Sequence, residues 1–186
     1  MKRRNLLFAL AAAPLAGLAR HLHAAPPKTM QGIEELQKNW KVLLAAGAEV
    51  PSPSDKLELA RDEWRKRLPP MAYSVLREEA TERPGSSPLN HEKRPGVFAC
   101  AGCGLPLFTS AMKFDSGTGW PSFFTAIPDA VTTKRDFKLI LPRTEYHCAR
   151  CGGHQGHVFD DGPEPTGLRY CNNGVALSFL PQSGKA

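Results

Sequence analysis

The sequence lacks an apolar run long enough to cross a membrane. Its longest apolar stretch is residues 6–19, whereas a spanning helix needs roughly 20 residues. Basic residues precede this stretch and Leu22-His23-Ala24 follows it, which is typical of an export signal over residues 1–24. Arg3-Arg4 resembles the twin-arginine signal that directs folded proteins for export in bacteria. We therefore expect an exported, periplasmic protein; the alternatives are an ordinary export signal and an uncleaved one that anchors the chain.

Acidic residues are absent from the first 24 residues, which carry Lys2, Arg3, Arg4 and Arg20. Without these four charges the net charge of +6 falls to +2. The basicity of the chain therefore lies largely in the signal, and we expect no nucleic-acid-binding surface. The roughly 160 residues that remain are enough for one compact domain with a hydrophobic core.

Internal repeats are also absent, apart from two short Cys-x-x-Cys turns. After the signal, residues 25–53 are predicted to form a linker and an amphipathic helix over residues 31–46, where apolar side chains recur at helical spacing. A proline-rich stretch at residues 50–54 ends this helix. Two further short helices are predicted at residues 62–68 and 70–78.

From residue 82 on, short apolar runs alternate with Gly and Pro, which favours strands joined by turns. The sequence therefore predicts a domain over residues 54–186 that is α+β and mainly β, with an antiparallel arrangement. The predicted strands are residues 96–99, 113–114, 123–124, 137–141, 145–147, 157–159, 169–170 and 176–180.

Only five cysteines are present, and their spacing divides them into four and one. The pairs Cys100/Cys103 and Cys148/Cys151 each form a Cys-x-x-Cys turn followed by Gly, a pattern that brings two thiolates to one tetrahedral ion. Four thiolates leave no open coordination position, so we predict one structural Zn²⁺ held by these cysteines. Bound iron, two redox-active pairs and two long-range disulfides are the alternatives.

Cys171 has no partner cysteine if the other four bind metal, which makes it a candidate nucleophile. On a strand, residues two apart point to one face, so Arg169, Cys171 and Asn173 are expected together, with Arg169 able to lower the thiol pKa. His154 and His157 are three residues apart and are expected to face Cys171 from a neighbouring strand or turn. The plain alternatives are structural histidines and an Arg169 that only pairs with Asp161.

The motifs of the chain resemble those of the B-type methionine sulfoxide reductases, which reduce the R epimer of methionine sulfoxide. The resemblance covers residues 54–179 and implies two antiparallel sheets with short N-terminal helices, a structural zinc site, and oxidised proteins or peptides as substrates. It also implies site roles for Trp120, His154, His157, Arg169, Cys171 and Asn173, with Asp161 as support. The matching segments are the two cysteine pairs, Phe114-Asp-Ser-Gly-Thr-Gly-Trp-Pro-Ser-Phe123, Arg143-Thr-Glu145, Gly153-His-Gln-Gly-His-Val-Phe-Asp-Asp-Gly-Pro163 and Gly167-Leu-Arg-Tyr-Cys171.

Sulfoxide reduction needs a thiolate on one side of the sulfur and an acid at its oxygen. Cys171 supplies the thiolate, and His154 or His157 is placed to give the leaving oxygen a proton near pH 7. The products are methionine and a sulfenic acid on Cys171. Trp120 offers an apolar face for the S-methyl group.

The chain departs from the family pattern at three positions. Thr118 stands where many members carry a further Cys that resolves the sulfenic acid, so an external thiol reductant such as a thioredoxin-like protein is expected instead. Gly174 stands where many members have Ser, and Gly85 where an aromatic residue is expected. We expect a monomer.

Two other functional classes stay open at this point. A zinc-ribbon-like binding module would use the same β scaffold but would not need Cys171 between Arg169 and Asn173. A thiol redox sensor would form the sulfenic acid with peroxide and would show no epimer-selective turnover.

Overall fold

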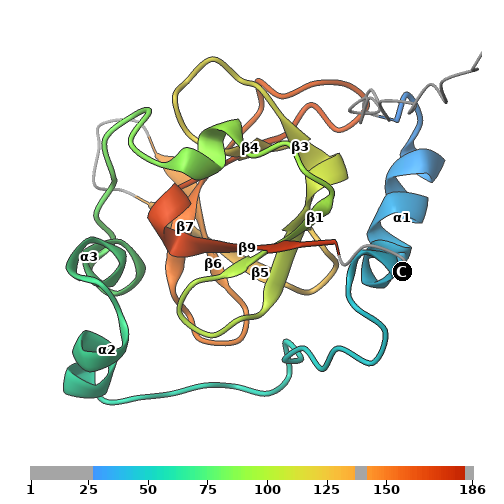
Figure 1. Cartoon of the computed structure of the whole chain (residues 1–186). Coiled ribbons are helices and arrows are strands. Elements are labelled where there is room, and N and C mark those ends of the chain that lie inside the picture. Colours follow the sequence, from blue (N-terminus) through green and yellow to red (C-terminus); the bar gives the residue numbers. More distant parts are fainter. Residues whose placement is uncertain (1–26, 137–141, 183–186) are drawn as a thin grey trace, which may run out of the picture.

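The computed structural model describes residues 27–136 and 142–182. The predicted export signal and the predicted strand at 137–141 lie outside the described residues. The described chain forms two antiparallel sheets with a few short helices around them, which confirms the α+β, mainly β prediction (Figure 1). Within the described ranges, none of the helices has the length and apolar character needed to cross a membrane.

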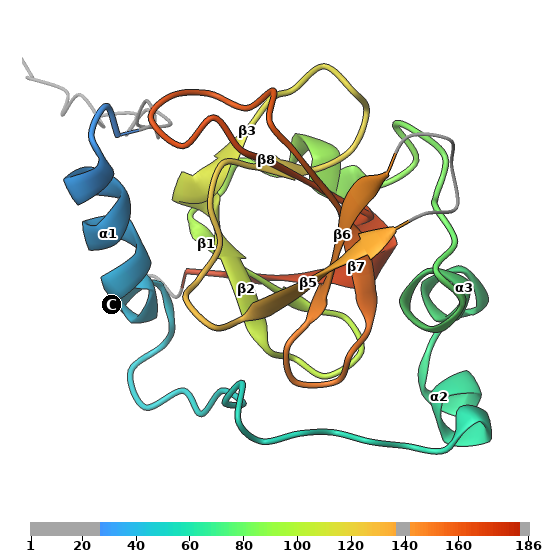
Figure 2. The same cartoon turned by 180° about the vertical axis from the view of Figure 1, so that it is seen from behind.

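The smaller sheet has the strand order β2-β1-β9, and the larger has the order β3-β4-β8-β7-β6-β5. Seen from behind, the strands curve around the space that the core side chains fill (Figure 2). The strands are β1 (Gly96–Cys100), β2 (Pro106–Thr109), β3 (Lys113–Phe114), β4 (Ser122–Phe123), β5 (Val131–Asp136), β6 (Arg143–Cys148), β7 (His154–Phe159), β8 (Arg169–Asn172) and β9 (Leu177–Pro181).

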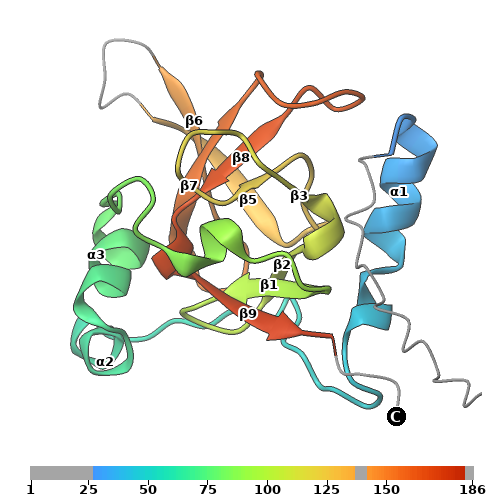
Figure 3. The same ribbon diagram turned by 45° about the horizontal axis from the view of Figure 1, so that its top comes forward.

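In the part of the chain that the structure describes, three α-helices lie outside the sheets, with α1 on one side and α2 and α3 on the other (Figure 3). The helix α3 (Pro70–Glu78) has the predicted bounds; Pro70 occupies its first turn, and it ends where Glu79 takes a left-handed conformation. The helix α2 (Arg61–Arg67) places acids in its first turn and bases in its last, which suits the helix dipole. The described residues also form the 3-10 helices η1 (Trp40–Leu43), η2 (Pro88–His91), η3 (Ser110–Met112) and η4 (Gly174–Ala176).

The predicted helix at residues 31–46 is too long. The α-helix α1 spans Met30–Lys38, and the chain then tightens into η1 and becomes extended at Leu44. Asn39 leaves the helical conformation at ψ 9° while its N–H still bonds to Glu35 O, as expected of a residue that favours helix ends over helix interiors. The burial is uneven as well, since Ile33 is buried whereas Val42 is exposed.

Two strands, β2 and β5, are missing from the prediction. The strand β2 is only four residues long and begins with Pro106. The strand β5, with the sequence Val-Thr-Thr-Lys-Arg-Asp, has an exposed middle and lies at the edge of the larger sheet. Because only its ends contact the protein interior, it has no apolar run to reveal it.

The core between the two sheets is aromatic. Phe108 of the smaller sheet stacks on Phe123 of the larger at a centroid distance of 4.1 Å, and Phe98 meets Phe123 edge-on at 5.1 Å. Tyr146 extends this cluster and donates its hydroxyl to Asn172 Oδ1 at 2.6 Å. The core therefore reaches the residue next to Cys171 and fixes the position of strand β8.

Candidate active site and cysteine cluster

The four paired cysteines lie at the ends of two strands. Cys100 ends β1 and Cys148 ends β6, and each is followed by a turn in which a Gly N–H bonds back to the cysteine carbonyl oxygen at 2.8 Å. Gly104 and Gly152 have φ values of 77° and 68°. Glycine adopts this conformation without strain, so the residue after each Cys-x-x-Cys pair closes the turn that aims both thiols inward.

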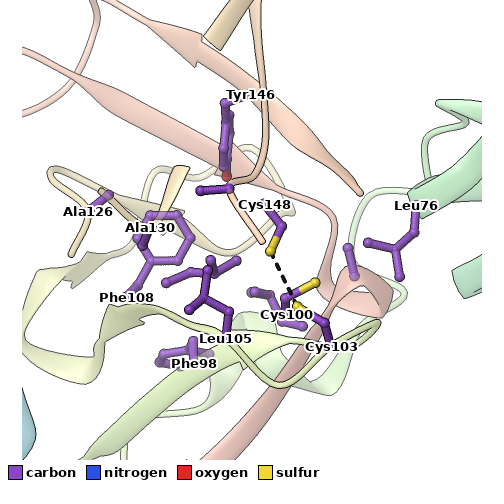
Figure 4. Close-up of a cluster of buried hydrophobic side chains, with 14 of the residues drawn as sticks. Leu76, Phe98, Cys100, Cys103, Leu105, Phe108, Ala126, Ala130, Tyr146 and Cys148 are labelled. Atoms are coloured by element: carbon purple, nitrogen blue, oxygen red, sulfur yellow. Dashed lines mark hydrogen bonds between the residues drawn. The ribbon is translucent and has the colours of Figure 1, made fainter. Parts of the chain in front are cut away.

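The four Sγ atoms lie within 4.8 Å of one another and the four residues are buried. Figure 4 shows Cys100, Cys103 and Cys148 of this cluster at the edge of the hydrophobic core. Cys100 Sγ lies 3.7 Å from Cys151 Sγ, and Cys103 Sγ lies 3.5 Å from Cys148 Sγ. A tetrahedron with Zn–S bonds of about 2.3 Å has S···S edges of about 3.8 Å. All five cysteines of the chain are free thiols. The cluster therefore fits a structural zinc ion and does not form disulfides.

The electrostatics of the cluster call for a cation. Hydrogen bonds among the four thiols raise the pKa of Cys100 well above its ordinary value and lower the pKa of Cys103, so the four groups do not titrate alike. Four thiolates this close together are stable only beside a positive ion. Gln155 Nε2 donates to Cys100 Sγ at 3.3 Å from outside the set, as the outer partners of metal ligands do.

Cys171 lies in β8, between β4 and β7. Its register partners are Ser122 on one side and His157 on the other. A Cβ atom on Gly156 would overlap the Cys171 carbonyl oxygen, so only glycine fits at this point of β7. Cys171 is partly exposed and opens into a pocket lined by Thr81, Trp120, Arg143, Gly156, His157, Phe159, Asn172 and Asn173.

Opposing effects set the protonation of the Cys171 thiol. Burial raises its pKa above the ordinary value, and the nearby Arg169 guanidinium and a hydrogen bond with Thr118 act in the lowering direction. The predicted influence of Arg169 is therefore present but smaller than the cost of burial. Thr118, which stands at the position of the missing resolving cysteine, itself contacts the thiol.

Arg169 forms an ion pair with Asp161, which was the plain alternative to a role of Arg169 at Cys171. Its Nε and NH2 donate to the two Asp161 carboxylate oxygens at 2.7 and 2.8 Å, and its guanidinium stacks over Phe159 at 4.3 Å. Asp161 is more than half exposed and lies outside the pocket lining. The pair and the stacking hold the Arg169 charge beside Cys171, so pairing and electrostatic influence occur together.

The two predicted histidines differ in position. His157 lies directly across from Cys171, and its Nε2 is 2.9 Å from Asp136 Oδ2, which also accepts from Arg143 NH2 at 2.6 Å. His154 is almost completely buried, and its Nδ1 lies 3.5 Å from Glu145 Oε2. The His154 ring meets the His157 ring edge-on at a centroid distance of 5.4 Å. His157 therefore lines the pocket, whereas His154 lies behind it.

Trp120 and Asn173 form further parts of the pocket. Trp120 Nε1 donates to Glu82 O at 3.2 Å, which fixes the ring. Asn173 is buried; its Nδ2 donates to Gln155 O at 3.0 Å and its Oδ1 accepts from Glu82 N at 2.9 Å. At Gly85, where an aromatic was expected, an added Cβ would meet nothing within 4 Å, and the Gly85 N–H donates to Gly119 O.

Several residues of the site were missed by sequence reasoning, chiefly Asp136, Arg143 and Gln155. Asp136 ends a strand that has no apolar signal, and the sequence carries nothing that pairs it with His157. Arg143 belongs to a motif segment but has no local pattern that directs it to the pocket. Gln155 sits between the two histidines, and only the fold brings its amide to the cysteine cluster.

Comparisons with known proteins show the family of the chain. Residues 68–181 match the SelR domain model. A peptide methionine sulfoxide reductase MsrB of Bradyrhizobium diazoefficiens is 51% identical over 136 residues, which are 73% of this chain and 98% of that protein. Proteins of the same name from Methanosarcina barkeri and Pseudomonas putida KT2440 are 52% and 51% identical and cover 66% and 68% of this chain, and 87% and 98% of their own.

Together with these matches, the site belongs to an oxidoreductase that acts on sulfur groups, and its cysteine cluster fits a structural metal ion. The chain belongs to the SelR domain family, that of the B-type methionine sulfoxide reductases. This confirms the family and the enzyme class predicted from the motifs.

Proposed function

We propose that the protein reduces methionine-R-sulfoxide in oxidised proteins or peptides through a single catalytic thiol. The observation that carries this proposal is that Cys171, Trp120 and His157 line one pocket, while the other four thiols are gathered elsewhere. The S-methyl group packs against Trp120, and the sulfoxide oxygen faces His157. Free methionine sulfoxide is a further candidate substrate.

In the proposed first step, the Cys171 thiolate attacks the sulfoxide sulfur and His157 donates a proton to the oxygen. Transfer of that oxygen to the cysteine sulfur leaves methionine and a Cys171 sulfenic acid. Asp136 orients His157 through the 2.9 Å contact, and His154 supports the ring from behind. Arg169, held by Asp161, favours the thiolate, and Asn173 lines the pocket beside it.

In the proposed second step, two thiols of an external reductant convert the sulfenic acid back to the Cys171 thiol, with one water and one reductant disulfide as products. A thioredoxin-like protein fits this role. The four cluster cysteines are buried, and Thr118 rather than a cysteine contacts Cys171; both facts support an external rather than an internal resolving thiol.

Cys100, Cys103, Cys148 and Cys151 would hold the structural zinc ion. A closed tetrathiolate site supplies folding free energy and no chemistry on the substrate. It would join the turn after β1 to the turn after β6 and so tie the two sheets together.

The decisive experiment is turnover of the separate R and S epimers of a methionine-sulfoxide peptide with a small dithiol as reductant. We expect consumption of the R epimer only, lost in Cys171→Ser, with the metal content of both proteins equal. Peroxide reactivity at Cys171 without turnover of either epimer would instead identify a redox sensor. If the protein neither turns over an epimer nor reacts with peroxide at Cys171, the zinc-ribbon-like binding module is the remaining interpretation.

We also propose that residues 1–24 are a twin-arginine export signal, that residues 25–53 are a linker and helix, and that the reductase domain occupies 54–186 as a monomer in the periplasm. Folding and metal loading before export would protect four thiols from oxidation, which favours export in the folded state. N-terminal sequencing of the protein from a periplasmic fraction tests the signal, and light scattering tests the monomer. A start at residue 1 in the cytoplasm would contradict the first proposal.

A further inference from the structure

Glu82 connects two walls of the Cys171 pocket through its backbone. Its N–H donates to Asn173 Oδ1 at 2.9 Å, and its carbonyl oxygen accepts from Trp120 Nε1 at 3.2 Å. Asn173 and Trp120 are far apart in the chain and lie on different loops. One residue therefore sets the separation of two side chains that line the pocket.

The Glu82 side chain binds the turn that follows Asn173. Its carboxylate is buried and accepts from Gly174 N at 2.6 Å and from Val175 N at 3.0 Å. Hydrogen bonds from backbone N–H groups to a carboxylate are among the stronger ones in proteins. The start of η4 is thereby fixed, and with it the backbone that carries Asn173.

Gly174 fits this arrangement closely. A Cβ atom at this position would overlap the Ser87 side chain and would lie 3.1 Å from Glu82 Oε1. Ser87 thus fills the space in which a larger residue at position 174 would stand. Ser87 therefore leaves room at position 174 for glycine and not for the serine that many family members have there.

We propose that Glu82 is a positioning residue of the active site, which holds Trp120 and Asn173 at the spacing that the sulfoxide side chain requires. The inference rests on the proposed function for its substrate. Within residues 27–136 and 142–182, Glu82 forms hydrogen bonds with Trp120, Asn173, Gly174 and Val175, and with none of Cys171, Arg169 and His157. Its loss should therefore weaken substrate positioning and leave the reactivity of the thiol unchanged.

The test is Glu82→Gln, which keeps the shape of the side chain but offers one acceptor oxygen to two N–H donors. The matched control is Glu92→Gln, because the Glu92 side chain is also largely buried and bonds Arg94, away from the pocket. We expect kcat/KM for the R-sulfoxide peptide to fall at least tenfold in Glu82→Gln, mainly through KM. The control should stay within twofold.

Two readouts separate positioning from general damage. Alkylation of Cys171 by iodoacetamide should change less than twofold in Glu82→Gln. In the nitrogen–proton spectrum, the indole signal of Trp120 should shift while those of Trp40 and Trp64 stay in place. Unchanged kcat/KM, or an alkylation rate that falls in parallel with turnover, would overturn the proposal.

A second pair of variants covers the case in which Glu82→Gln does not fold. Gly174→Ala should displace the turn and lower kcat/KM, and adding Ser87→Gly should restore most of it by vacating the overlapped space. A double variant as impaired as the single one would count against the proposal. If the wild-type protein reduces neither epimer, the proposed function fails, whereas the Trp120 signal and the alkylation rate still test the positioning role.

Discussion

The cysteine cluster and the Cys171 pocket differ in how the chain builds them. The cluster consists of two turns of four residues, each closed by its own glycine and its own hydrogen bond, and joining them requires only that β1 and β6 end side by side. The pocket takes Trp120 from one loop, His157 from β7 and Asn173 from another loop, and the neighbouring segment around Glu82 holds it together. Local pattern determines the first region, and tertiary contacts determine the second.

The cysteine cluster and the Cys171 pocket also differ in the chemistry that they suit. The cluster buries its thiols against one another, which suits a metal and excludes a substrate. The pocket leaves one thiol partly exposed, with a cation and a hydroxyl group beside it. We expect changes in the cluster to act on stability and changes in the pocket to act on turnover.

The largest effect should come from metal removal. Cys148→Ser, or a strong chelator, should lower the free energy of unfolding by several kcal/mol, because roughly 10–16 kcal/mol of metal binding is linked to folding in small zinc domains. Thermal unfolding together with a metal assay measures this effect. A Tm that is unchanged after complete loss of metal would show that the hydrophobic core alone holds the sheets.

Cys171→Ser should act on turnover and leave stability nearly unchanged. Replacing the thiolate by a hydroxyl should lower turnover of the R epimer by roughly 10³-fold or more, while metal content stays the same and Tm moves little. Single-turnover assays and thermal unfolding on one sample measure both quantities. A large fall in Tm here would break the division between the two regions.

Arg169→Met should affect the pocket alone and to a smaller extent. Burial raises the pKa of Cys171 and Arg169 opposes the rise, so removing the charge should move the pKa further up. At pH 7 the thiolate fraction then falls about tenfold for each pKa unit. The rate of alkylation against pH measures the shift, with Arg169→Lys as the control that keeps a charge but loses the paired contact to Asp161. If the pH dependence of alkylation is the same in Arg169→Met as in the wild-type protein, Arg169 does not lower the pKa of Cys171.

The sequence predicts the cluster almost completely, because metal spacing is a local pattern. It also predicts that Cys171 and Arg169 lie on the same face, because residues two apart on a strand point to one side. It does not predict Asp136, whose strand is polar and lies at a sheet edge, or the contact between Glu82 and Asn173, which joins residues 91 apart. The predicted helix at 31–46 is too long because its apolar period continues past Asn39, where the chain leaves the α-helix and goes on as the 3-10 helix η1, whose Trp40 packs against the core.

Gln155 provides the most sensitive test of how separate the two regions are. Its side chain is fully buried, donates to Cys100 Sγ at 3.3 Å, and accepts from Asn172 Nδ2 at 3.4 Å. Gln155→Met keeps the length of the side chain and removes both bonds. Metal affinity should fall about tenfold, because outer partners of metal ligands contribute on that order. Turnover should fall only a few-fold, since Asn172 keeps its bonds to Asn173 O and Tyr146. Metal release to a chromogenic chelator and R-epimer turnover measure the two effects. If turnover falls as far as metal affinity, Gln155 transmits the state of the cluster to Cys171, and the two regions work as one.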